Sequence, residues 1–182
     1  MAAGTSSRFG SNKLTACLDG QSLIRRALEA IPAELVHQTV VVTQYPEISA
    51  LAKEYSFTVI FNEYPKIGIS KTVKLGLSQL ADCDGVLFLV ADQPLLRQET
   101  VAALIALWQR HPACIAAPAH NGQRGNPCLF PARFFPELLA LEGDRGGSAV
   151  IRRHPEALLL LETDPQQLAD ADTPDQLAQL HR

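Results

Sequence analysis

Short apolar runs alternate with longer amphipathic segments along this chain. The apolar runs, which predict buried β-strands because β-branched and other apolar residues sit side by side, cover 39–43, 58–61, 85–91 and 113–117. The amphipathic segments, which predict helices, cover 46–55, 70–80 and 99–108. This alternation predicts a Rossmann-like three-layer α/β/α fold with a mostly parallel sheet. Ligands of such sheets bind at the carboxyl ends of the strands, so the loops after the strands are where chemistry is expected.

The bulk composition is that of one globular domain, residues 1–182. Hydrophobic residues make up 47% and charged residues 19%, which is ordinary for a soluble protein. A formal net charge of -3 gives no basis for general nucleic-acid binding, so any phosphate site must be local. No apolar run is long enough to cross a membrane, and no signal peptide is visible. The four cysteines are widely spaced, which is typical of reduced thiols and favours a cytoplasmic location.

The chain begins with a loop of small, hydroxyl and basic residues. Ala2, Ala3 and Gly4 leave little side-chain bulk, so backbone N–H groups can approach phosphate oxygens closely. Arg8 can form a fork to a phosphate, and Lys13 adds a compact positive charge. By composition alone a flexible polar N-terminus is the simpler interpretation, and the loop is neither a Walker P-loop nor a dinucleotide fingerprint. A strand needs about 5–6 residues, so the strand that would support this loop is expected to lie upstream or to be truncated.

A carboxylate follows the clearest predicted strand. Asp92 comes directly after the apolar run 85–91, and Pro94 stops that run two residues later. A carboxylate at this position projects from the carboxyl edge of the sheet. Mg²⁺ is commonly held by one or two carboxylates together with substrate phosphates, whereas the simpler alternative is that Asp92 caps a turn.

Several segments together resemble one family. They are the loop 2–14 (AAGTSSRFGSNKL), the glycine-to-helix segment 68–77, the strand end 89–94, the segment 120–130 with its Gln-Arg-Gly-Asn-Pro core, the glycine turn 143–147 and the Asp-Ala-Asp-Thr-Pro segment 170–175. These motifs are similar to those of the nucleotidyltransferase superfamily that activates sugars, alditols and pterin cofactors. The loop is most similar to that of the molybdenum cofactor cytidylyltransferases. The resemblance extends over most of the chain.

The resemblance implies a role for each nucleotide-side residue. The backbone of Ala2, Ala3 and Gly4 wraps the triphosphate, Arg8 and Lys13 stabilise it, Gly68, Ser70 and Thr72 contact the base and ribose, and Asp92 and Asp172 hold Mg²⁺, with Asp170 as a weaker second candidate. Simpler interpretations exist for some of them. Ser70 is a good helix N-cap, and Thr173-Pro174 is an ordinary helix start.

The acceptor side is implied by the same resemblance. Arg124, Gly125 and Asn126 belong to the segment that faces the acceptor, and Asp144 belongs to the second glycine turn. Asn126 stands where most relatives have His, which argues against an acid–base role there. From the pattern alone, a polar hairpin turn between two strands is an equally good interpretation of this segment.

The implied reaction is the transfer of CMP from CTP to a molybdopterin-type cofactor, with release of pyrophosphate and with Mg²⁺ bound. Guanylyltransferase relatives usually have two glycines where this chain has Ala3-Gly4 and carry a GPLxG-type segment absent here, which favours CTP over GTP. The implied partner is the molybdenum hydroxylase that receives the product. Two alternatives stay open: a nucleotidyltransferase for another small phosphorylated acceptor, and a non-catalytic chaperone that carries the cofactor.

Overall fold

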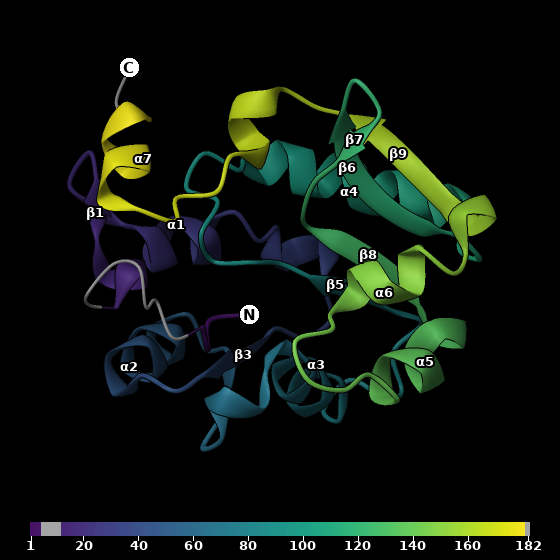
Figure 1. Ribbon diagram of the computed structural model, residues 1–182, viewed down its shortest axis with the longest axis horizontal. Helices are drawn as coiled ribbons and strands as arrows, with labels where there is room; N and C mark the ends of the chain where they lie inside the picture. The colour runs from purple at the N-terminus through teal and green to yellow at the C-terminus, as the bar shows by residue number, and fades with distance from the viewer. Residues whose placement is uncertain (5–11, 181–182) are drawn as a thin grey trace.

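A central sheet flanked by helices organises the described part of the chain, residues 1–4 and 12–180 of a computed structural model (Figure 1). The strands are β1 (Cys17–Leu18), β2 (Gln21–Ser22), β3 (Val40–Thr43), β4 (Thr58–Phe61), β5 (Gly85–Phe88), β6 (Ile115–His120), β7 (Gln123–Arg124), β8 (Cys128–Pro131) and β9 (Leu158–Glu162). The α-helices are α1 (Leu23–Glu29), α2 (Pro46–Glu54), α3 (Ile69–Leu77), α4 (Gln98–Arg110), α5 (Phe135–Leu139), α6 (Gly147–Ile151) and α7 (Pro174–Gln179). Short 3-10 helices include η1 (Lys13–Thr15) and η6 (Pro165–Leu168).

Most strands of the central sheet run in one direction. β3 and β4 pair in parallel, and so do β6 and β9. β8 lies antiparallel between β5 and β6, so β5 and β6 run the same way as each other. β7 joins β6 as a short antiparallel hairpin. The predicted mostly parallel sheet is therefore confirmed, with β7 and β8 as its antiparallel members.

Alternating side chains along the strands fill two separate cores, one on each face of the sheet. Ile115 and Ala117 pack with α3, α5 and α6, whereas Ala116 between them packs with α4. On β3, Val41 packs with α1 and α2. Because neighbouring side chains of a strand point to opposite faces, helices must cover both faces to bury them. The predicted three-layer arrangement is confirmed.

One strand is shorter than its apolar run predicts. The run 85–91 predicts a single strand, but β5 ends at Phe88. The register explains the difference, because pairing with β8 stops where Phe88 faces Cys128. The prediction was wrong for Leu89–Ala91, which continue toward Asp92 outside the β5–β8 ladder.

The first two residues lie in the middle of the molecule, between β3 and β5 (Figure 1). Ala2 forms an isolated parallel bridge with Thr43, and its N–H donates to the carbonyl of Val42 at 3.0 Å. The amine of Met1 donates to the carbonyl of Leu89 at 2.6 Å. The chain thus enters the nucleotide loop from the sheet interior. In the described ranges, no helix combines the length and apolarity needed to cross a membrane.

Candidate active site

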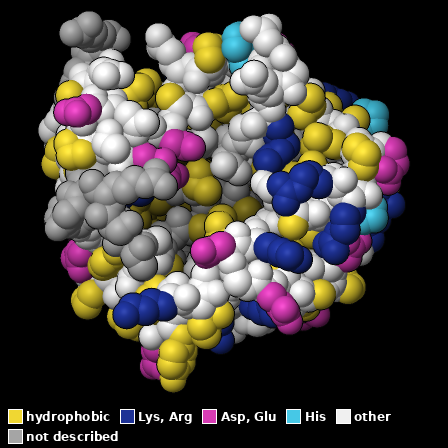
Figure 2. Space-filling model, viewed as in Figure 1, with side chains coloured by type: hydrophobic (Ala, Val, Ile, Leu, Met, Phe, Trp, Pro, Cys, Tyr) yellow, Lys and Arg dark blue, Asp and Glu magenta, His cyan; other side chains and the backbone are white. Residues whose placement is uncertain are grey.

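A cleft of about 400 Å³ opens beside the carboxyl ends of β3 and β5. The predicted site residues that line it are Ala2, Ala3, Gly4, Lys13, Gly68, Thr72, Asp92, Asp144 and Asp172. Figure 2 shows acidic side chains around a hollow in the centre of this face, with Lys and Arg side chains gathered beside it over α6. Segments from both ends of the chain therefore meet at one site. Arg8 falls outside the described residues.

Lys13 is the ionic centre of the cleft. Its ammonium contacts the Asp92 carboxylate at 2.7 Å and the Asp172 carboxylate at 2.8 Å. Burial alone would lower the pKa of Lys13, but the hydrogen bonds and charges of Asp172 and Asp92 outweigh burial and raise it. Lys13 is therefore fully charged at neutral pH, and one cation serves two carboxylates.

Backbone contacts bring the C-terminal segment to Asp92. The N–H of Ala171 donates to the carbonyl of Asp92 at 2.8 Å, which places the next residue, Asp172, beside it. The side-chain amide of Gln93 donates to the carbonyl of Leu168 at 3.1 Å. These two contacts join the turn after β5 to a segment some 80 residues later, so the second carboxylate depends on the folded C-terminal region.

Asp170 differs from its neighbour Asp172. Burial and the charge of Asp92 raise the pKa of the Asp170 carboxyl, while a hydrogen bond from Gln93 opposes that rise. Among the residues that the structure describes, Lys13 forms ion pairs with Asp92 and Asp172 and none with Asp170. Asp172 is therefore the better placed second carboxylate.

Both described ends of the nucleotide loop are anchored. The side-chain amide of Gln44 donates to the carbonyls of Ala3 and Gly4, and the hydroxyl of Tyr45 donates to the carbonyl of Gly4 at 2.7 Å. Where the described chain resumes, Asn12 caps η1 by accepting from the N–H of Leu14, whose side chain is buried. These contacts fix where the loop leaves and rejoins the sheet.

The glycine-to-helix segment touches the second glycine turn. Gly68 has a φ of 109°, and a Cβ at this position would lie 2.5 Å from the carbonyl carbon and oxygen of Gly143. The N–H of Ser70 donates to the same carbonyl at 3.1 Å. This close approach needs glycine, and the residue after Gly143, Asp144, lines the cleft.

Ser70 and Thr72 are both buried on the first turns of α3. The hydroxyl of Thr72 accepts from the side-chain amide of Asn62 at 3.3 Å, and Thr72 also lines the cleft. The alternative interpretation of Ser70 as the N-cap was wrong, because Gly68 occupies that position without a side-chain cap. The contacts of Ser70 and Thr72 with base or ribose stay predictions.

The acceptor segment is a hairpin, as the simpler interpretation proposed. Its turn is at Asn121 and Gly122, which both have positive φ values. Arg124 on β7 donates to the hydroxyl of Ser148 at 2.7 Å and to the thiol sulfur of Cys128 at 2.9 Å. Burial raises the pKa of the Cys128 thiol, and the Arg124 charge only partly opposes this. The hairpin therefore presents a half-buried guanidinium held by neutral groups.

Arg124, Gly125 and Asn126 are not among the residues that line the cleft. The N–H of Gly125 donates to the carbonyl of Pro118 at 2.8 Å, and acceptor binding by Gly125 stays a prediction. A Cβ on Gly125 would press against Leu168. This glycine serves packing. Acceptor binding by Arg124 and Asn126 stays a prediction.

The residues present fit a divalent cation bound together with phosphates. Within the described residues, no group of three or more His, Cys, Asp or Glu side chains could hold a metal by itself. Asp92 and Asp172 nevertheless converge within hydrogen-bond distance of one cationic atom, so a cation at this point is favoured. Mg²⁺ commonly uses one or two carboxylates and completes its shell with phosphate oxygens and water.

Sequence reasoning missed Gln44, Tyr45 and Asn62. A usable signal existed, because all three directly follow the predicted strands 39–43 and 58–61 at the carboxyl edge. Asp92 was predicted from the same kind of position. Gln44, Tyr45 and Asn62 differ from it in being neutral.

The family is decided by the extent of the match to known sequences. The family model of the MobA-like NTP transferase domain matches residues 1–158. The chain belongs to this family. It is a nucleotidyltransferase, and the cleft at the carboxyl ends of β3 and β5 lies within the matched region together with all of its predicted site residues except Asp172.

Relatives and solved structures agree with this assignment. The chain is similar to the purine catabolism protein PucB of Bacillus subtilis, with 28% identity over 195 residues that cover 100% of this chain and 94% of PucB. A nucleotidyl transferase from Methanothermobacter thermautotroptrophicus superposes with a TM-score of 0.82 at 20% identity, covering 99% and 93% of the two chains. Rv0371c of Mycobacterium tuberculosis has a TM-score of 0.79 at 22% identity over 99% and 94%. A manganese complex of Rv0371c has also been solved and superposes with a TM-score of 0.75 at 21% identity over 98% and 93%.

Proposed function

We propose that this protein is a molybdenum cofactor cytidylyltransferase, which transfers CMP from CTP to a molybdopterin-type cofactor and releases pyrophosphate. The observation that carries the proposal is the arrangement of Lys13 between Asp92 and Asp172 in the same cleft as the start of the nucleotide loop. Ala3-Gly4 in the loop and the Gln-Arg-Gly-Asn-Pro segment 123–127 support CTP and the cofactor, respectively.

The transfer forms one phosphorus–oxygen bond and breaks another. An oxygen of the acceptor phosphate attacks the α-phosphorus of CTP, and the bond between the α-phosphorus and its bridging oxygen to the β-phosphate breaks. The electron pair of that bond leaves with pyrophosphate, so no covalent enzyme intermediate is needed. Catalysis of this kind depends largely on positioning and on charge balance.

The residues of this chain supply both the positioning of the triphosphate and the balance of its charge. The small residues Ala2 to Gly4, anchored by Gln44 and Tyr45, let the backbone approach the triphosphate. Lys13 balances the charge that develops on the leaving pyrophosphate. Asp92 and Asp172 would hold Mg²⁺, which supplies further charge neutralisation to the phosphates when bound.

Nucleotide and acceptor choice can be tested together. The protein is incubated with Mg²⁺, the molybdopterin cofactor and each of CTP, GTP, ATP and UTP, and pyrophosphate release is measured. CTP should give the fastest release, and only with the cofactor present. Release with GTP alone would refute the cytidylyl assignment, and release with CTP and an alditol phosphate instead of the cofactor would refute the acceptor.

The variant Asp92→Asn distinguishes a catalytic transferase from a chaperone that only carries the cofactor. Losing one of two carboxylates at the cation position should lower CTP-dependent pyrophosphate release by about 10³-fold, since metal stabilisation is worth several kcal/mol. Exposed Glu34→Gln on the far 3-10 turn is the control and should leave release unchanged. If Asp92→Asn keeps full delivery of cofactor to a molybdenum hydroxylase, the chaperone alternative is the better one.

A further inference from the structure

Two buried glutamines lie where the turn after Asp92 meets the segment 163–172. Gln93 directly follows Asp92 and is 3% exposed, and Gln167 lies on η6 and is 7% exposed. Burying a side-chain amide in a protein interior costs free energy that hydrogen bonds must offset. The partners that these two amides find therefore decide how the two segments are held together.

The two side chains reach across in opposite directions. The amide nitrogen of Gln93 donates to the carbonyl of Leu168 at 3.1 Å. The amide oxygen of Gln167 accepts from the N–H of Arg97 at 3.1 Å and from the hydroxyl of Thr100 at 2.6 Å, both at the start of α4. Each segment thus holds the other through a glutamine of its own. We call this pair, Gln93 and Gln167, the glutamine clamp.

Within the described residues, the segment 163–172 lies outside the strands of the sheet. β9 ends at Glu162, and the N–H of Thr163 donates to the carbonyl of Ala119 on β6 at 2.8 Å. The chain then forms η6, a single turn of four residues, before α7 begins at Pro174. A single turn outside a ladder depends on side-chain hydrogen bonds for its place, and the glutamine clamp supplies them.

The clamp lies close in sequence to the second carboxylate. Past η6, the N–H of Ala171 donates to the carbonyl of Asp92, and Ala171 is fully buried. Asp172 then contacts Lys13, which also contacts Asp92. Because Gln93 and Asp92 are adjacent, the clamp and the Ala171–Asp92 hydrogen bond join the same two segments at separate points. Together they fix both the distance and the orientation of Asp172 relative to Asp92.

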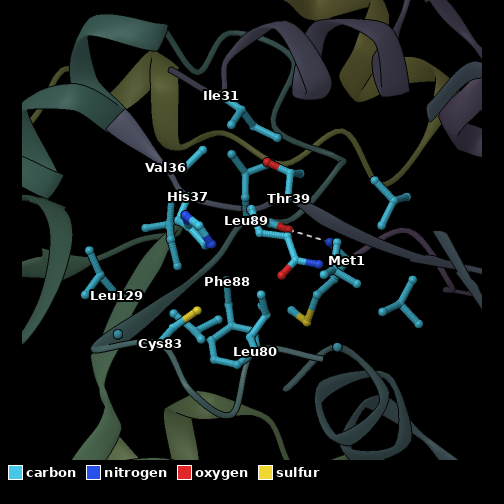
Figure 3. Close-up of a pocket in the computed structure, with 18 of the residues that line it drawn as sticks. Met1, Ile31, Val36, His37, Thr39, Leu80, Cys83, Phe88, Leu89 and Leu129 are labelled. Atoms are coloured by element: carbon cyan, nitrogen blue, oxygen red, sulfur yellow. Dashed lines mark hydrogen bonds between the residues drawn. The ribbon is translucent and has the colours of Figure 1, made fainter. Parts of the chain in front are cut away.

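The apolar cavity of about 420 Å³ between β3 and β5 lies apart from the clamp. Figure 3 shows Phe88 and Leu89 among its described lining residues, which include neither Gln93 nor Gln167. Substitutions at the clamp therefore leave the lining of this cavity unchanged. Their effect on the two carboxylates is expected to pass through the segment 163–172.

We propose that Gln93 and Gln167 are positioning residues for the divalent cation, because the clamp sets Asp172 at the distance from Asp92 that one shared cation needs. The inference rests on the proposed function and extends it to two residues that are not among the described lining of the cleft. Groups that hold metal-binding side chains in place commonly contribute about 10–100-fold to metal affinity. Loss of either amide should therefore weaken metal binding selectively.

Three variants separate hydrogen bonding from volume. Gln167→Leu removes the accepting oxygen, whereas Gln167→Glu keeps an oxygen that accepts from Arg97 and Thr100, at a helix start where negative charge is favourable. Gln166→Leu changes the exposed glutamine beside it on η6 and is the matched control. Mn²⁺ binding without nucleotide is measured from the loss of the free Mn²⁺ signal in electron paramagnetic resonance. Gln167→Leu should bind Mn²⁺ at least about tenfold more weakly, Gln167→Glu should recover most of that loss, and Gln166→Leu should match the unchanged protein.

Hydrogen exchange follows the segment 163–172 without any metal. The Ala171 amide should exchange at least about tenfold faster in Gln167→Leu and in Gln93→Met, because both variants loosen the segment that carries it. The Thr58 amide, which donates to the carbonyl of Thr39 beside β4, is the internal reference and should not change.

Thr100→Val removes the hydroxyl that donates to Gln167 and keeps the shape of the side chain, so it tests the same hydrogen bond if Gln167→Leu does not fold. It should also weaken Mn²⁺ binding. The double variant with Gln167→Leu should bind Mn²⁺ no more weakly than Gln167→Leu alone, because both substitutions break one interaction.

Equal Mn²⁺ affinity in Gln167→Leu and Gln166→Leu would overturn the proposal. An equal loss in Gln167→Leu and Gln167→Glu would overturn it as well, since volume or polarity in general, and not the accepting oxygen, would then be what matters. The proposed function fails in a different way: if no nucleoside triphosphate gives pyrophosphate release, the transferase reaction is refuted, while Mn²⁺ binding and hydrogen exchange still report on the clamp.

Discussion

The cleft and the Arg124 hairpin are assembled in different ways. In the cleft, Lys13 contacts Asp92 and Asp172, which lie 79 and 159 residues away in the sequence. In the hairpin, Arg124 contacts Ser148, only 24 residues away, and closer neighbours within the hairpin itself. The cleft is a meeting of distant segments, whereas the Arg124 hairpin is largely a local structure.

The partners also differ in charge. In the cleft, Lys13, Asp92 and Asp172 each have an opposite charge beside them, so removing one changes the charge balance of a partly buried site. The hydrogen-bond partners of Arg124 are a hydroxyl, a thiol and a carbonyl, so its removal leaves neutral groups. We therefore expect substitutions in the cleft to change both chemistry and stability, and substitutions in the Arg124 hairpin to change mainly acceptor binding.

Lys13→Met should give the largest effect of the three substitutions that test this contrast. The rate of pyrophosphate release should fall by roughly 10²–10³-fold, because one preorganised cation facing the leaving group is lost. Asp92 and Asp172 would then lack their shared cation. Added Mg²⁺ should consequently raise the thermal midpoint of Lys13→Met more than that of the unchanged protein.

Lys53→Met is the matched control for this experiment. Lys53 is exposed in the last turn of α2, so its loss should leave both the rate and the response to Mg²⁺ unchanged. An equal response to Mg²⁺ in Lys13→Met and in the unchanged protein would contradict the view that one cation position is shared by the two carboxylates.

Arg124→Gln should give a smaller and more selective effect. A charge-assisted hydrogen bond to an acceptor phosphate is worth about 1.5–3 kcal/mol, so KM for the acceptor should rise about tenfold or more. KM for CTP should stay constant, because Arg124 does not line the nucleotide cleft. Steady-state kinetics with each substrate varied in turn measure both constants.

Two further variants exclude a merely structural role for Arg124. Arg124→Lys keeps the charge but not the fork and should recover part of the acceptor affinity. Arg110→Gln removes an exposed charge at the end of α4 and should change neither KM. A rise in KM for CTP equal to that for the acceptor would show that the Arg124 hairpin and the cleft do not act separately.

The same contrast explains what could be predicted from the sequence. Position after an apolar strand was enough to place Asp92 at the carboxyl edge, and the resemblance placed Lys13 and Asp172 in the same site. Their mutual contact could not be predicted, because it depends on the Ala171–Asp92 hydrogen bond between segments far apart in the chain. The hairpin around Asn121 and Gly122 was one of two equally good interpretations of the sequence pattern, because its residues are local.

The remaining misses have physical causes as well. The length of β5 is set by where its register with β8 ends, which no apolar run encodes. Neutral residues such as Gln44 and Asn62 carry no charge signal, although their positions after strands were visible in the sequence.

Gly68→Ala should give the smallest effect on catalysis. It tests the close contact between Gly68 and the carbonyl of Gly143. The new Cβ would meet the Gly143 carbonyl at 2.5 Å and would force alanine into a backbone region that it rarely adopts. The free energy of unfolding should fall by about 2–4 kcal/mol, from backbone strain together with the clash. Denaturant titration measures this change.

Gly20→Ala separates strain from clash. Gly20 also has a positive φ, of 78°, but a Cβ there meets nothing within 4 Å, so this variant should lose only about 1–2 kcal/mol. Because the Gly143 turn carries Asp144 on the cleft wall, Gly68→Ala should also raise KM for both CTP and the acceptor by a similar factor. If only one KM rises, the Gly68–Gly143 contact supports the binding of only one of the two substrates.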